Sequence, residues 1–150
     1  MKKPRILLAD DHPDLLSALS ELLEDGLGEV VGTVTDGQEI VEAAQRLKPD
    51  VIILDISMPG LNGLDATRTL QTSVPQSKVI ILSIHQEPVY VSLAIKAGAR
   101  GYLLKRTALY AELSQALLHV LAGDRYIGLG VREERAPVDG AEVSTWRPEL

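Results

Sequence analysis

Short runs of apolar residues alternate along the chain with longer segments in which apolar residues recur every three or four positions. The runs are largely β-branched and continuous, which is typical of parallel strands that are buried on both faces. They predict five strands, at Arg5–Ala9, Val30–Val34, Val51–Leu54, Lys78–Leu82 and Gly101–Leu104.

The segments between these runs have the periodicity of amphipathic helices. The first is the clearest, because Leu15, Leu19 and Leu22 lie on one stripe together with Leu16 and Leu23. Similar stripes predict helices within residues 40–47, 64–70, 89–97 and 109–121. Five such β-α units in about 120 residues predict a doubly wound (βα)5 α/β fold with a five-stranded parallel sheet.

The pattern changes near residue 124. The last stretch, "GDRYIGLGVREERAPVDGAEVSTWRPEL", mixes charge, glycine and proline without a period. We therefore expect one domain over residues 1–123 and a linker or C-terminal tail over residues 124–150. Tyr126 and Ile127 are candidates for a small ordered element within that tail.

Composition and charge narrow the functional classes. The net charge of −6 gives no overall basic footprint for nucleic acid or an anionic membrane, and the absence of cysteine excludes disulfides and thiolate metal sites. The apolar run Ile6–Ala9 is too short for a signal peptide, and no run approaches the ~20 residues of a membrane helix. We expect a cytoplasmic protein without membrane association.

Polar side chains follow four of the predicted strands. Asp10 and Asp11 follow the first, Asp55 the third, Ser83 the fourth and Lys105 the fifth. In an open α/β sheet, ligands bind beyond the carboxyl ends of the strands, so these side chains are expected to converge at one edge. Singly, each has a plainer explanation: helix capping for the acid pair, a loop or strand-end position for the others.

Together, these residue types suit phosphoryl transfer. Three neighbouring carboxylates repel one another and need a cation at neutral pH, and oxygen ligands favour Mg²⁺. A lysine and a hydroxyl can bind phosphoryl oxygens, while one carboxylate acts as the nucleophile. Asp55, at the end of a buried strand, is the candidate for an aspartyl-phosphate.

Four sequence segments are similar to the receiver domain of two-component response regulators: "ILLADDHP", "PDVIILDISMPGLNGLDATR", "KVIILSIH" and "AGARGYLLK". They are most like the LuxR/NarL-type subfamily. The resemblance implies a flavodoxin-like sheet of strand order 2-1-3-4-5. It implies that Asp55 accepts a phosphoryl group from a sensor histidine kinase. Asp11, Asp55 and the Ile56 carbonyl would bind Mg²⁺ directly, and Asp10 partly through water.

The same resemblance implies roles for six other residues. Ser83 and Lys105 would contact the phosphoryl group, and Tyr102 would act with Ser83 as the switch. The surface that changes would lie on the fourth helix, fifth strand and fifth helix. Three positions would modulate the phosphate's lifetime: Ser57, Ile84 and His85. The resemblance further implies homodimerisation, and contact with nucleic acid only through a C-terminal DNA-binding domain absent from this chain.

Three other functions compete with the phosphorylation switch. A phosphatase of the haloacid-dehalogenase type would need an acid where Ser57 stands, so we do not expect a turnover enzyme. A flavin mononucleotide binder would need Ser, Thr or Gly after the first strand, where Asp10 and Asp11 would repel a phosphate. A protein-interaction module that works without phosphorylation stays open as the alternative.

Overall fold

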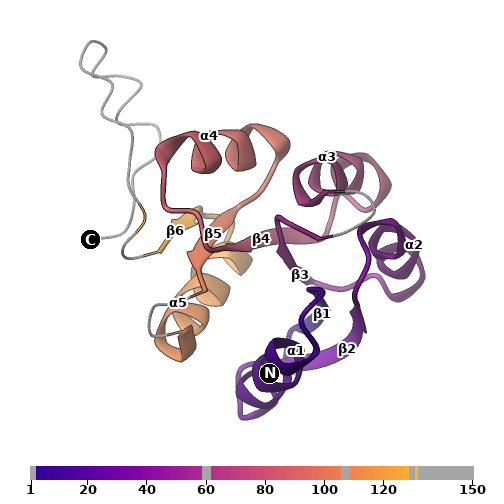
Figure 1. Ribbon diagram of the computed structural model, residues 1–150. Coiled ribbons are helices and arrows are strands. Elements are labelled where there is room, and N and C mark those ends of the chain that lie inside the picture. The colour runs from indigo at the N-terminus through magenta and orange to yellow at the C-terminus, as the bar shows by residue number, and fades with distance from the viewer. Residues whose placement is uncertain (1–2, 59–61, 106–108, 129–130, 132–150) are drawn as a thin grey trace.

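The computed structural model describes residues 3–58, 62–105, 109–128 and 131, without the side chains of residues 109 and 110. Strands and helices alternate throughout (Figure 1). Their bounds are β1 Arg5–Ala9, α1 Pro13–Glu24, β2 Glu29–Val34, α2 Gly37–Leu47, β3 Val51–Asp55, α3 Gly63–Ser73, β4 Lys78–Ser83, α4 Pro88–Ala97, β5 Gly101–Leu104, α5 Leu109–Leu121 and β6 Tyr126–Ile127.

The strands form one parallel sheet of order β2-β1-β3-β4-β5-β6. The predicted doubly wound parallel fold and its order 2-1-3-4-5 are therefore confirmed. The sheet gains a sixth strand, because β6 pairs with β5 through Gly101↔Tyr126 and Tyr102↔Ile127. This strand lies in the segment that we expected to be a linker, and it joins the start of that segment to the sheet.

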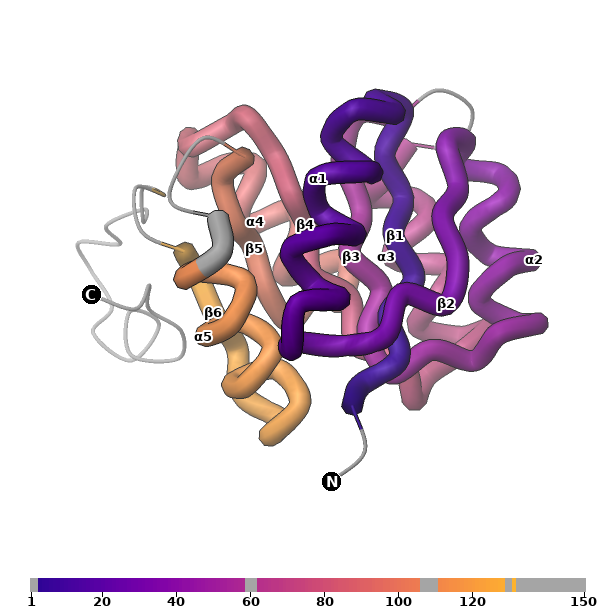
Figure 2. The backbone as a smooth tube through the Cα atoms, turned by 90° about the horizontal axis from the view of Figure 1, so that it is seen from below, coloured from indigo at the N-terminus to yellow at the C-terminus, as the bar shows by residue number. Residues whose placement is uncertain are grey.

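Helices cover both faces of the sheet (Figures 1 and 2). Side chains of β1, β3 and β4 alternate between two cores. Leu7, Ile52 and Ile81 face a core shared with α2, α3 and α4, whereas Ile6 and Ile53 face a core shared with α1 and α5. These central strands are buried almost throughout, which explains their continuous apolar sequence.

Local sequence signals explain several element boundaries. Pro13 occupies the first turn of α1, where a missing backbone N–H costs nothing. The Asp36 and Asn62 side chains accept backbone hydrogen bonds at the starts of α2 and α3. Gly98 ends α4 in the left-handed conformation (φ +114°), as its position in the sequence suggests. Among the described residues, we find no helix of the length and apolar character needed to span a bilayer.

Gly63 lets the start of α3 approach the end of β3. Its N–H donates to the Ile56 carbonyl over 3.0 Å. A Cβ at this position would lie 2.6 Å from the Ile56 Cα and 2.7 Å from the Asp55 carbonyl oxygen. Both are backbone atoms that cannot rotate away, so only a residue without a side chain fits at position 63.

Gly63→Ala is therefore expected to lower the free energy of unfolding by about 1–3 kcal/mol through overpacking. Urea denaturation followed by circular dichroism measures the change. Thr72→Ala, at an exposed position of the same helix, is the control and should change stability by less than about 0.5 kcal/mol. Equal stability of the two variants would contradict the proposed close approach.

Candidate functional site

The carboxyl ends of four strands bring the predicted site residues to one edge of the sheet. Asp55 is the last residue of β3 and Ser83 the last of β4, while Asp10 and Lys105 directly follow β1 and β5. The strands are in register, with Leu54 beside Ala9 and Ser83 beside Leu104. Residues separated by up to 95 positions in sequence thereby share one site.

The acidic residues form a compact cluster. One oxygen or nitrogen from each of Asp10, Asp11, His12 and Asp55 lies within 4.8 Å of the others. Asp10 and Asp55 are buried, with 1% and 3% of their surface exposed. The Asp11 side chain is 33% exposed. Solvent therefore reaches the cluster at Asp11 but hardly at Asp10 or Asp55.

Lys105 bridges the two buried acids. Its Nζ lies 3.0 Å from Asp10 Oδ2 and 3.1 Å from Asp55 Oδ2. Burial lowers the pKa of Lys105, but the hydrogen bond and charge of Asp10 and the charge and hydrogen bond of Asp55 outweigh it, so its pKa lies above the ordinary value. The ammonium group therefore stays protonated between two carboxylates.

The donor set fits a hard divalent cation. The Asp11 Oδ1 atom is buried and accepts no hydrogen bond from the described residues. It lies 3.1 Å from His12 Nδ1. The ligand atoms of Asp10, Asp11 and Asp55 lie within 4.8 Å of one another, and Mg²⁺ prefers carboxylate and other oxygen ligands. The Ile56 carbonyl, which accepts from Gly63, retains a second lone pair for an ion.

The acid pair does not cap α1 with its side chains. The N-cap residue is His12, and it makes no side-chain cap hydrogen bond. Asp10 Oδ1 instead accepts from the backbone N–H of His12 over 2.9 Å and lies 2.8 Å from its Nδ1. This contact raises the pKa of His12, helped by the charges of Asp10 and Asp11. The sequence places His12 at the border of the site, where packing or modulation is expected of it more than metal ligation, because Mg²⁺ prefers oxygen.

Ser83, Tyr102 and the backbone of His85 form a second hydrogen-bonded group. Ser83 is fully buried, and its Oγ accepts from the His85 backbone N–H over 2.9 Å. Tyr102 is also fully buried, and its hydroxyl donates to the His85 carbonyl over 2.7 Å. Burial raises the pKa of Tyr102 to about 12, and a hydrogen bond with Ser83 opposes this increase. The two predicted switch residues are therefore neighbours, with Tyr102 in the inward position.

The three residues predicted to modulate the phosphate's lifetime lie beside Asp55 and Ser83. The Ser57 backbone N–H donates to Asp55 Oδ1 over 3.1 Å, and its side chain is exposed. Ile84 is 58% exposed beside Ser83. The His85 ring stacks on Tyr90, with centroids 4.1 Å apart, so the aromatic ring of α4 fixes its orientation.

Comparison with known proteins identifies similar chains. The family model "Response regulator receiver domain" matches residues 6–117. The response regulator GacA of Pseudomonas viridiflava is 39% identical over 133 residues, which are 88% of this chain and 62% of that protein. The chain thus spans about three fifths of the length of this curated relative.

Solved structures are similar as well. A LuxR-family two-component response regulator from Aurantimonas sp. SI85-9A1 superposes with a TM-score of 0.77 at 33% identity, covering 83% of this chain and 89% of that one. The isolated receiver domain of RcsB from Salmonella enterica serovar Typhimurium, solved with the phosphomimetic BeF3⁻, gives a TM-score of 0.79 at 26% identity, covering 87% and 96%. These findings confirm the resemblance noted in the sequence.

Replacing Lys105 by methionine should leave two buried carboxylates facing each other without a cation. We expect a loss of about 2–4 kcal/mol in the free energy of unfolding, measured by urea denaturation in the presence of a chelator. Lys96→Met, at an exposed position of α4, is the matched control and should be nearly neutral. If the two variants were equally stable, the bridge would contribute nothing.

Tyr102 should make stability depend on alkaline pH. Its pKa of about 12 lies above the ordinary value of 10, so its contribution is fully present below pH 10 and is lost as pH rises through 12. Two pKa units correspond to about 2–3 kcal/mol. Tyr102→Phe cannot ionise, so its denaturation midpoint should fall less steeply over this range. Parallel curves for the two proteins would show that Tyr102 ionises as freely as in the unfolded chain.

Proposed function

Because the chain belongs to the response regulator receiver domain family, we propose that it is a phosphorylation-dependent signalling switch with Asp55 as the phosphoryl acceptor. The observation that carries this proposal is the convergence of Asp10, Asp11 and Asp55 with the Lys105 ammonium group at one edge of the sheet. Receiver domains of response regulators are signalling proteins and not turnover enzymes.

The transfer would proceed at the Asp55 carboxylate. One Asp55 oxygen attacks the phosphorus of a phosphohistidine on a sensor kinase. The O–P bond forms as the N–P bond breaks, and the histidine nitrogen keeps the electron pair and later takes up a proton. Lys105, now 3.1 Å from Asp55 Oδ2, would turn its charge to a phosphoryl oxygen.

Asp11, Asp55 and the Ile56 carbonyl would hold Mg²⁺ directly, with Asp10 acting partly through water. When bound, the ion would supply positive charge that offsets the carboxylates and the incoming phosphoryl oxygens. Burial of Asp10 and Asp55 excludes most water from the reacting side, which strengthens these charge interactions. The exposed side of Asp11 leaves the approach open.

Ser83 and Tyr102 would transmit the change. A phosphoryl oxygen at Asp55 can accept from the Ser83 hydroxyl, which now lies beside the Tyr102 hydroxyl. Movement of Ser83 would remove one hydrogen-bond partner of Tyr102. The conformation of the surface formed by α4, β5 and α5 would then change. Ser57, Ile84 and His85 would set the lifetime of the phosphoryl group through access of water.

The output would lie outside the described domain. We propose that residues 1–123 form the receiver domain and that residues 124–150 lead from it as a linker, with β6 attached to the sheet. A LuxR-type DNA-binding domain would make any contact with nucleic acid. We also propose that the receiver domain forms a homodimer.

Intact-mass spectrometry after incubation with acetyl phosphate and Mg²⁺ tests the switch. We expect the mass of one phosphoryl group to be added to the protein, and no addition to Asp55→Asn or in the presence of a chelator. Glu87→Gln, which replaces an exposed carboxylate near the site, is the control and should still be modified. No adduct on folded protein at short times would favour an interaction module that works without phosphorylation.

A further inference from the structure

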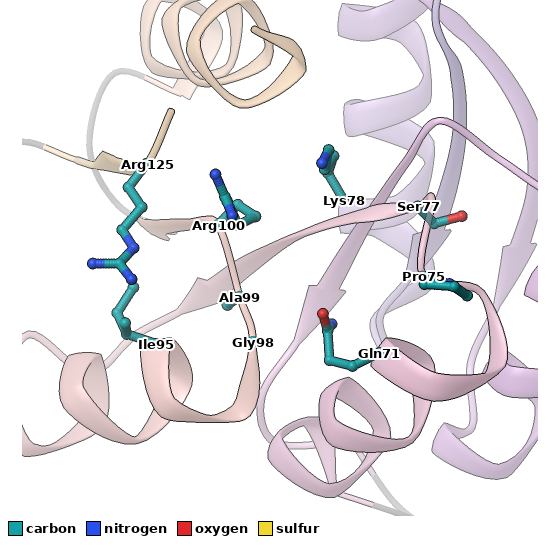
Figure 3. Close-up of a pocket in the computed structure, with 9 residues that line it drawn as sticks. All are labelled: Gln71, Pro75, Ser77, Lys78, Ile95, Gly98, Ala99, Arg100 and Arg125. Carbon is teal, nitrogen blue, oxygen red and sulfur yellow. The ribbon is translucent and has the colours of Figure 1, made fainter. Parts of the chain in front are cut away.

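A polar pocket of about 220 Å³ lies at the opposite end of the strands from the acidic cluster (Figure 3). Lys78, the first residue of β4, lines it, as do Arg100 just before β5 and Arg125 just before β6. Gln71 of α3 and Ser77 complete its polar wall. Lys78 and Ser83 are five steps apart along β4, or about 16 Å at the rise of a strand, so the pocket is separate from the Asp55 site.

The pocket concentrates positive charge on an acidic chain. Its lining residues include three cations and no carboxylate, although the chain has a net charge of −6. Within the part of the chain that the structure describes, Lys78, Arg100 and Arg125 make no ion pair. Three like charges around one cavity repel one another, and an anion between them would remove that cost.

Only part of the Arg100 guanidinium group makes a hydrogen bond within the described residues. Its Nη2 donates to the Gly123 carbonyl at the end of α5, which fixes the guanidinium group. Its Nε is buried and has no hydrogen-bond partner among the described residues. A buried donor without an acceptor is costly, so a shift of the Arg100 side chain that brought its Nε–H to a phosphate oxygen in the pocket would remove that cost.

Existing hydrogen bonds determine which other polar groups of the pocket can still bind a ligand. The Ser77 hydroxyl donates to the Pro49 carbonyl over 2.6 Å and so has no hydrogen left for a ligand. Gln71 Nε2 donates to the Thr67 carbonyl over 3.2 Å and keeps its second hydrogen. Gly98 leaves room for the Gln71 side chain, because a Cβ at position 98 would overlap that side chain. The charged groups that line the pocket, Lys78, Arg100 and Arg125, are all donors.

We propose that this pocket binds the diphosphate group of a small molecule. The charge of +3 matches a diphosphate better than a carboxylate, and the Arg125 guanidinium group, which makes no hydrogen bond to the described residues, can form paired hydrogen bonds with phosphate oxygens. Diphosphate can come from inorganic pyrophosphate or from a nucleotide, and the two sources share the chemistry that the pocket recognises. The anion would join the starts of β4, β5 and β6.

Titration of the ¹⁵N-labelled full chain, followed through the Nε–Hε signals of its arginines at constant ionic strength, tests the proposal. Pyrophosphate should produce saturable shifts at Arg100 and Arg125, but not at Arg46, which is exposed on α2 and outside the pocket. ADP in a parallel titration separates the sources. Equal affinity means recognition of the diphosphate alone, and tighter binding of ADP means that a nucleotide is favoured.

Arg125→Gln should weaken pyrophosphate binding about tenfold, because one charge-assisted contact is lost. Arg125 is exposed and has no bond of its own to lose, so this variant should fold even if Arg100→Gln does not. Arg46→Gln is the control with the same loss of charge, and Asp55→Asn should bind normally. Shifts that do not saturate, that affect Arg46 equally or that occur with ADP only would overturn the proposal. An unchanged pyrophosphate affinity in Arg125→Gln would overturn it as well.

Discussion

The contact of the Lys105 ammonium group with Asp10 and Asp55 is the interaction on which the site depends. Two carboxylates that are almost fully buried would repel each other, and burial without a partner is costly for each. Lys105 compensates both from the end of β5. The ion pairs therefore join the ends of β1, β3 and β5 across the sheet. They also place a cation where a phosphoryl group on Asp55 would carry negative charge.

The fold follows from the sequence because its main signals are local and repeated. Continuous apolar runs predict strands buried on both faces, and the leucine stripe around Leu19 predicts a helix without reference to the rest of the chain. The strand ends then place Asp10, Asp55, Ser83 and Lys105 together, although the roles of these residues depend on the family resemblance. β6 is harder to predict, because its two residues have no periodicity and are held by pairing with β5.

Other features depend on contacts between distant residues, which a single sequence does not reveal. The inward position of Tyr102 depends on the His85 carbonyl, seventeen positions away. The basic pocket combines side chains at the starts of three different strands, β4, β5 and β6, which lie far apart in the sequence. Three acids thus collect at the carboxyl ends of β1 and β3, whereas the cations of the pocket, which make no ion pair with the described residues, lie at the amino ends of β4, β5 and β6. This separation would let one small domain offer two sites for different ligands.

The central claim is that Asp55 is the residue that becomes phosphorylated, and locating the phosphoryl group tests it most directly. Borohydride reduces an acyl phosphate to an alcohol, so protein treated with acetyl phosphate and Mg²⁺ can be reduced, digested and sequenced by tandem mass spectrometry. The account predicts homoserine at position 55 and unchanged aspartate at positions 10 and 11. Homoserine at position 10 or 11, with Asp55 intact, would contradict it.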